Sequence, residues 1–95
     1  MLELRPSCEA CSRPLPPSST DARICSFECT FCAACAQRLE NVCPNCGGGF
    51  YPRPVRPKVL LARYPATGVK VEKPVDTSVH GDFCRLYRHV EPQHR

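Results

Sequence analysis

The chain has 95 residues, among them 9 cysteines and 11 prolines, and its formal net charge at pH 7 is +4. A chain of this length forms one small domain with a thin apolar core, and such domains usually need disulfides or metal ions for stability. It has no run of about 20 apolar residues, which excludes a membrane-spanning helix, and it is too short for a catalytic barrel of roughly 250 residues.

The cysteines are concentrated in the first half of the chain. All except Cys84 lie between residues 8 and 46, and most of them form C-x2-C pairs. The start of the chain has no apolar stretch typical of a signal peptide, which predicts a cytoplasmic location. In a reducing cytosol such pairs indicate metal ligands, and eight thiolates suffice for two closed zinc sites. An iron–sulfur cluster and a disulfide scaffold are the alternatives.

Several short elements are predicted in chain order. Residues 14–19 are rich in proline and serine and predict an extended loop. Residues 24–27 alternate like a short strand, and residues 33–41 contain mostly strong helix formers. The stretch 43–48 is typical of a tight metal-binding turn, with glycine after its second cysteine.

The second half of the chain is basic and poor in large apolar residues. Residues 51–95 carry 9 Lys and Arg against 4 Asp and Glu. Prolines recur through residues 51–58 and predict an extended linker. Beyond it we expect short strands over 59–64 and 69–73 and a helical turn or two over 82–90. We therefore divide the chain into a metal-binding domain (1–50), a proline-rich linker (51–58) and a partly ordered basic extension (59–95).

Two pairings of the eight clustered cysteines compete. In the sequential pairing the first four share one metal and the last four share the other. A helix over 33–41 disfavours the sequential pairing. At a rise of 1.5 Å per residue, the helix carries the chain away from the metal bound by Cys35, and too few residues remain before Cys43 to return to that metal. The interleaved pairing removes this strain, whereas a hairpin in place of the helix would restore the sequential one. The interleaved pairing assigns Cys8, Cys11, Cys32 and Cys35 to site one and Cys25, Cys29, Cys43 and Cys46 to site two.

The spacing of the eight cysteines over residues 8–46 resembles the RING finger pattern. Cysteine occupies every ligand position, including Cys29, where many members have histidine, and Pro44 lies inside the last pair. The resemblance implies a cross-braced domain with a short hairpin and one helix, as in treble-clef zinc folds. Ubiquitin ligases of this class usually have large or basic residues at places that here hold Ala10, residues 36–42 without tryptophan, and Gly47.

A closer resemblance covers roughly residues 2–57. The strings Cys8-Glu9-x-Cys11, Leu15-Pro16-Pro17, residues 24–32 and Cys43-Pro44-Asn45-Cys46-Gly47-Gly48, followed by Arg53-Pro54, are similar to a family of short bacterial proteins with eight cysteines. That family has no assigned activity. The resemblance implies a bacterial cytoplasmic protein.

Other groups suggest contacts beyond the metal sites. Cys84 is expected to be a buried or half-buried thiol. The alternatives are that it is a reactive thiol, or that it forms a third metal site with His80, His89 and His94. The residues Ile24, Phe27, Phe31, Leu39 and Val42 are expected to fill the core, with Phe31 the most exposed of them. The basic residues Arg53, Arg56, Lys58, Arg63, Lys70 and Lys73 are candidates for phosphate contacts, and Phe50, Tyr51 and Tyr64 for stacking on bases.

The sequence thus predicts a small metal-stabilised α+β protein, RING-like or treble-clef, with two zinc ions, a short hairpin, one helix and an irregular C-terminal extension. Closed four-thiolate sites are structural, so we expect no enzymatic activity. The predicted function is that of a protein-interaction adaptor with no membrane partner and no small-molecule substrate. A nucleic-acid-binding module and a redox or metal sensor are the alternatives.

Overall fold

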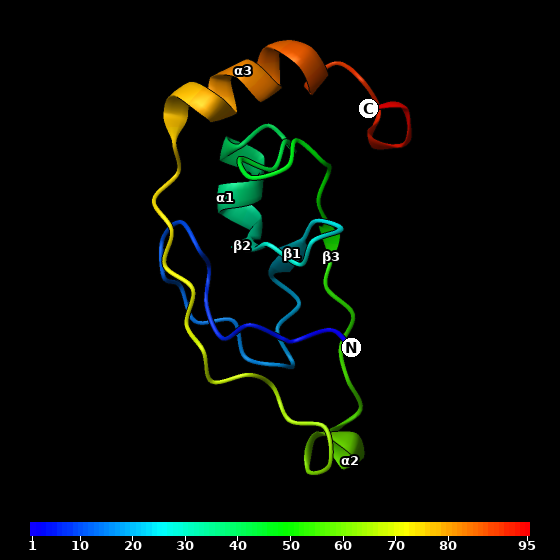
Figure 1. Cartoon of the computed structure of the whole chain (residues 1–95). Coiled ribbons are helices and arrows are strands. Elements are labelled where there is room, and N and C mark those ends of the chain that lie inside the picture. The colour runs from blue at the N-terminus through cyan, green and yellow to red at the C-terminus, as the bar shows by residue number, and fades with distance from the viewer.

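The computed structural model describes residues 1–95 as a small α+β fold with extents of 43 × 26 × 19 Å (Figure 1). The sheet and α1 lie in the middle, α3 crosses one end, and α2 lies at the opposite end. None of the helices is long and apolar enough to cross a membrane. The elements are β1 (Ala22–Ile24), β2 (Thr30–Cys32), α1 (Ala33–Arg38), β3 (Tyr51–Pro52), α2 (Lys58–Leu61), α3 (Thr77–Tyr87) and a final 3₁₀ turn (Pro92–His94).

The sheet has three short antiparallel strands in the order β2-β1-β3. In the hairpin, Ala22 pairs with Cys32 and Ile24 with Thr30, and residues 25–29 form the turn. Glu28 adopts a left-handed φ of 64°, and its N–H donates to the carbonyl of Cys25 at 3.0 Å. The observed strand therefore begins and ends earlier than the predicted 24–27, because the chain already reverses after Ile24.

Helix α1 begins at Ala33, as predicted, but ends at Arg38 rather than at Asn41. Glu40 and Asn41 both have a φ of 58°, which ends the helix, and the N–H of Asn41 donates to the carbonyl of Ala36 at 3.1 Å. The chain then enters the last C-x2-C turn, where the N–H of Cys43 donates to the carbonyl of Gly48 at 2.8 Å.

The core contradicts two expectations about aromatic residues. Phe31 is 1% exposed and packs edge-to-face on Phe50, with ring centroids 5.2 Å apart. Phe27 is 70% exposed. The physical reason is position: Phe31 lies in the middle of β2, which is buried on both faces, whereas Phe27 lies in the hairpin turn outside the paired residues.

The strands predicted over 59–64 and 69–73 are wrong. Residues 58–61 form α2, and residues 66–76 form no regular element. A strand needs a paired edge along its length. This segment is instead held by single backbone hydrogen bonds, from Thr67 to the carbonyl of Glu3 at 2.9 Å and from Lys73 to the carbonyl of Glu9 at 3.2 Å.

The C-terminal helix is longer than the predicted turn or two and starts five residues earlier than 82. Asp76 caps it, and its Oδ1 accepts hydrogen bonds from the N–H groups of Ser78 and Val79 at 3.0 and 3.1 Å. Aspartate before a helix is a recognised start signal, so the sequence did contain this information. Phe83 and Tyr87 of α3 lie against Gly47, and Arg95 donates to the carbonyls of Asn41 and Gly47. The end of the chain thus packs on the cysteine-rich part.

Two arginines that the sequence offered as candidates for phosphate contacts instead donate hydrogen bonds to backbone carbonyls within the fold. Arg53 is 4% exposed and donates to the carbonyls of Arg5, Leu15 and Pro16 at 2.8 to 3.1 Å. Burial lowers the pKa of its guanidinium, which nonetheless stays charged because its ordinary pKa is so high. Arg56 donates to the carbonyls of Leu2 and Tyr64, both at 2.7 Å. The hydrogen bonds of Arg53 therefore connect the N-terminal segment to the chain directly after β3.

We expect Arg53→Met to destabilise the metal-loaded protein by about 2–4 kcal/mol, because three carbonyls lose a charged donor. Urea unfolding followed by far-UV circular dichroism at fixed metal concentration measures this. The control is Arg63→Met at an exposed position, for which we expect little change. Equal effects of the two substitutions would contradict the role of Arg53.

Candidate metal centres

The first centre gathers thiols from two distant segments. Cys8 and Cys11 lie in the first C-x2-C turn, Cys32 ends β2 and caps α1, and Cys35 lies in the first turn of α1. Their four Sγ atoms all lie within 4.8 Å of one another, and those of Cys11 and Cys32 are 3.8 Å apart. Three of the thiols are buried, and Cys11 is exposed.

The second centre is built at the turn of the hairpin. Cys25, Cys43 and Cys46 have their Sγ atoms within 4.8 Å of one another. Cys29 is outside this mutual set, but it lies close enough to Cys25 and Cys43 to shift the pKa values of both thiols. The two groups contain seven of the eight clustered cysteines, divided as in the interleaved pairing, and Cys29 belongs to neither group. All nine cysteines of the chain are free thiols, so no disulfide is formed.

The first and the last C-x2-C turns, Cys8–Cys11 and Cys43–Cys46, have the same backbone shape. The N–H of Ser12 donates to the carbonyl of Cys8 at 2.9 Å, and the N–H of Gly47 donates to that of Cys43 at 2.8 Å. Ser12 and Gly47 follow the second cysteine of each pair and have left-handed φ values of 64° and 78°. This turn points both sulfurs of a pair to the same side.

Donors near the sulfurs distinguish the two centres. At site two the side-chain amide of Asn45 donates to Cys29 Sγ and the N–H of Gly48 donates to Cys46 Sγ, both at 3.4 Å. At site one the guanidinium of Arg38 lies 3.7 Å from Cys35 Sγ. Such donors stabilise negative charge on thiolate sulfur, because N–H dipoles or a positive charge point at it.

Because the sulfur atoms are crowded together, several thiols of one cluster cannot all lose their protons unless a cation is bound. At site one, burial and then the neighbouring sulfurs raise the pKa of Cys35 above its ordinary range. At site two, interaction with Cys25 and Cys29 raises the pKa of Cys43, while interaction with Cys29 and Cys43 lowers the pKa of Cys25 to about 3. A cluster therefore readily holds one thiolate among thiols, and four thiolates together require a positive ion.

The donor set fits zinc. Zinc binds four thiolates tetrahedrally at about 2.3 Å, which places the sulfurs roughly 3.8 Å apart. The separation of Cys11 and Cys32 equals this value, and the other sulfurs of site one lie within 4.8 Å. Both cysteine clusters are placed to hold a metal ion.

Sequence analysis missed Glu9, which links the first centre to the sheet. Glu9 is 4% exposed, accepts a hydrogen bond from the N–H of Thr30, and pairs with Arg5 at 3.0 Å. Its own N–H donates to the carbonyl of Thr30 at 2.9 Å. Burial raises the pKa of its carboxyl, while Thr30 and Arg5 oppose this rise. An acidic residue inside a C-x2-C pair was the available signal, because a buried carboxylate must have partners.

Cys84 and the three histidines form no third cluster of metal-binding groups. Cys84 is buried, as predicted, at 5% exposure in α3. His80 Nε2 lies 3.3 Å from its sulfur and 2.9 Å from the carbonyl of Leu39, but His89 and His94 join no group of candidate ligands. The thiol therefore lies where α3 meets the residues that follow α1, beside His80 and its contact with Leu39.

These features define a small cysteine-rich protein with two candidate metal centres. The chain belongs to the family described as "Protein of unknown function (DUF1272)", whose model matches residues 1–56 and so includes all eight clustered cysteines. It is similar to the uncharacterized protein R02474 of Rhizobium meliloti (strain 1021), with 60% identity over 75 residues that cover 78% of this chain and 89% of that protein. No solved structure matches the chain. The predicted membership in a family of unknown function is confirmed.

We expect Glu9→Ala to weaken metal binding at site one by about 10- to 100-fold, because the first turn loses its attachment to β2. Competition with a chromogenic chelator measures this affinity. Glu9→Gln retains the shape and one acceptor and should have a smaller effect, and Glu91→Ala at an exposed position is the control. If Glu91→Ala weakens binding as much as Glu9→Ala, the attachment has no special role.

Proposed function

We propose that this chain is a zinc-binding protein in which two structural four-cysteine sites hold a RING-like, treble-clef scaffold together. Its function on this proposal is that of a non-catalytic adaptor that binds a protein partner. The observation that carries it is the interleaved arrangement of two thiol clusters within a very small core. Four thiolates fill the tetrahedral coordination of zinc and leave no position for a reacting water, which favours a structural over a catalytic role.

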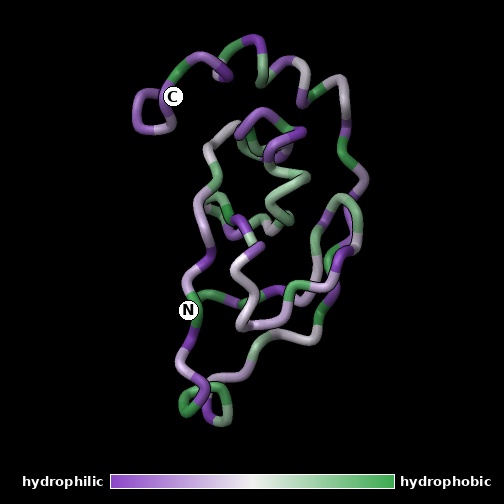
Figure 2. Tube along the Cα trace, turned by 180° about the vertical axis from the view of Figure 1, so that it is seen from behind, coloured by the Kyte–Doolittle hydropathy of each residue, from purple (hydrophilic) through white to green (hydrophobic).

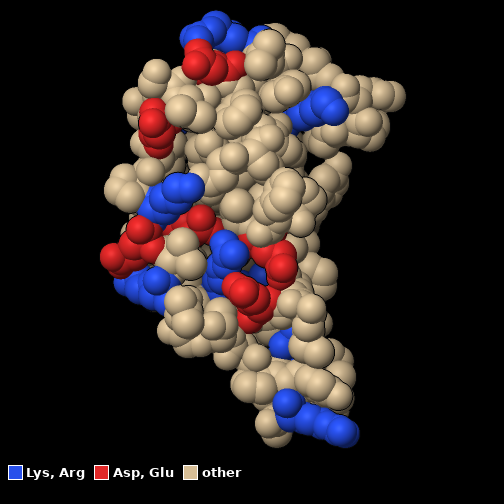
Figure 3. Space-filling view, in the orientation of Figure 1, with Lys and Arg blue, Asp and Glu red and all other residues tan.

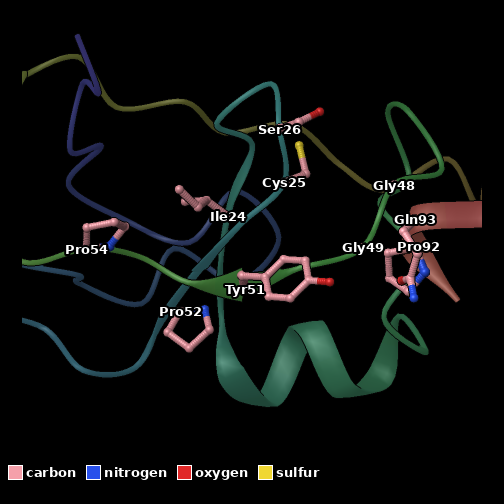
Figure 4. Close-up of a pocket in the computed structure, with 10 residues that line it drawn as sticks. All are labelled: Ile24, Cys25, Ser26, Gly48, Gly49, Tyr51, Pro52, Pro54, Pro92 and Gln93. Atoms are coloured by element: carbon pink, nitrogen blue, oxygen red, sulfur yellow. The ribbon is translucent and has the colours of Figure 1, made fainter.

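A groove beside the hairpin supports the adaptor role. It has a volume of about 540 Å³, and Figure 4 shows its wall formed by the sheet on one side and by the C-terminal turn on the other. We call it the hairpin groove. Its lining residues are Ile24, Cys25, Ser26, Gly48, Gly49, Tyr51, Pro52, Pro54, Pro92 and Gln93.

Two exposed aromatic residues flank the hairpin groove. Tyr51 in its wall is 59% exposed. Phe27, 70% exposed, lines a second cavity of about 230 Å³ that shares Ser26, Gly48 and Pro92 with the hairpin groove. Aromatic residues are enriched in protein interfaces and often dominate their energetics. An extended peptide segment of a partner fits such a surface.

The structure offers less to the nucleic-acid alternative. Arg53 and Arg56 donate to backbone carbonyls, and Lys70 pairs with Glu72 at 2.8 Å. The other basic residues suggested for phosphate contacts do not line the hairpin groove; they are Lys58, Arg63 and Lys73. A protein partner at the groove therefore accounts for more of the observed surface.

Metal content tests the first half of the proposal. We expect two zinc ions per chain by native mass spectrometry of anaerobically purified protein, one in Cys8→Ser and one in Cys43→Ser. Cys84→Ser is the matched control and should retain two, because Cys84 lies outside both clusters. Iron with sulfide, or equal metal loss in all three variants, would contradict two four-cysteine zinc sites.

Site-specific photo-crosslinking in cells tests the adaptor role. A photoreactive phenylalanine analogue at position 51 or 27 should give a discrete adduct with one protein, because both side chains flank the hairpin groove. The same analogue at position 86 is the control, since Leu86 is 64% exposed but lies on α3 outside the groove. No adduct at 51 and 27, or the same adducts at 86, would contradict a docking surface at the groove.

A further inference from the structure

The segment around α2 presents apolar side chains to solvent at one end of the molecule. We call residues 55–69 the apolar tip. Its exposed fractions are 84% for Val59, 69% for Val69, 52% for Val55, 43% for Leu60 and 37% for Tyr64. Figure 2 shows hydrophobic residues in this loop, far from the cysteine-rich part of the chain. Several exposed large apolar side chains within one short segment point to a binding site.

The apolar tip is also cationic. The chain has no Asp or Glu between Glu40 and Glu72. Lys58 and Arg63 are exposed and pair with no carboxylate, and Arg63 lies over the ring of Tyr64 at 5.7 Å. Figure 3 shows blue and no red at the narrow lower end of the molecule, whereas both colours mix in the middle. The charge of this surface is thus complementary to an anionic partner.

Hydrogen bonds hold the apolar tip in place. Arg56 donates to the carbonyls of Tyr64 and Leu2, which closes the loop and ties it to the N-terminal segment. The N–H of Tyr64 donates to the carbonyl of Leu60 at 2.7 Å, and that of Thr67 to the carbonyl of Glu3. Its apolar residues are therefore presented in a fixed arrangement and cannot fold back into the core without breaking these bonds.

We propose that the apolar tip binds an anionic lipid surface. Val59 and Leu60 enter the boundary between headgroups and acyl chains, Lys58 and Arg63 contact lipid phosphates, and Tyr64 lies at headgroup level. Residues 55–69 line neither cavity of the molecule. Lysine beside aliphatic residues is typical of membrane surfaces but is depleted in protein interfaces, which favours lipid over a protein groove. The expectation of no membrane partner rested on the lack of a spanning segment, which surface binding does not need.

Sedimentation with vesicles tests this proposal on the full, metal-loaded chain. The protein should bind vesicles of equal parts phosphatidylglycerol and phosphatidylcholine, bind phosphatidylcholine vesicles far less, and dissociate as salt is raised. Val59→Asp with Leu60→Asp should reduce binding at least about tenfold, and Lys58→Glu with Arg63→Glu likewise. Leu86→Asp is the matched control: it alters an exposed leucine of α3 and should leave vesicle binding unchanged.

Several outcomes would overturn the proposal. One is no binding of the wild-type protein to anionic vesicles at low salt. Another is binding that the cation variants abolish but the Val59 and Leu60 variant retains, which would indicate charge attraction alone. A third is capture by soluble poly-glutamate in place of vesicles, which would assign the tip to an acidic protein. Metal content and circular dichroism establish that each variant is folded, so a lost fold is not mistaken for a lost contact.

Discussion

The interleaving of the two thiol clusters is the constraint on which the rest of the fold depends. The hairpin turn with Cys25 and Cys29 lies in sequence between the two halves of site one, and Cys32 and Cys35 lie between the two halves of site two. Along the chain, pairs of cysteines from the two clusters therefore alternate. Half of the 12 residues in the core cluster are cysteines, so the same side chains serve as core and as candidate ligands. Bound metal would supply the stability that so few apolar residues cannot.

The cysteine-rich half was largely predictable because its information is local. The C-x2-C spacing determines which sulfurs face the same side, and a helix beginning at Ala33 makes the interleaved grouping the shorter path. The end of α1 was not predictable, since Glu40 and Asn41 take left-handed conformations that neither residue type requires. The positions of Phe27 and Phe31 also depended on where the hairpin turns, and a shift of the turn exchanges exposed and buried residues.

The basic half was predicted less well because charge composition does not distinguish a solvated cation from a buried one. Arg53 and Lys58 look alike in the sequence, yet one satisfies three carbonyls in the interior and the other stands on the apolar tip. The same limit applies to Glu9, whose role appears only once Thr30 and Arg5 are placed beside it. Long-range partners decide these cases, and they are separated from these residues in sequence by up to 48 positions.

Both edges of the small sheet are closed to further strands. At β3, Pro52 and the nearby Pro54 have no N–H to offer to another chain. At β2, the N–H and carbonyl of Thr30 are already bonded to Glu9. Unpaired strand edges are templates for aggregation, so this sheet is protected on both sides by its own neighbours. For the hairpin groove, which runs along β3, the consequence is that a bound peptide must be recognised through its side chains rather than by strand addition.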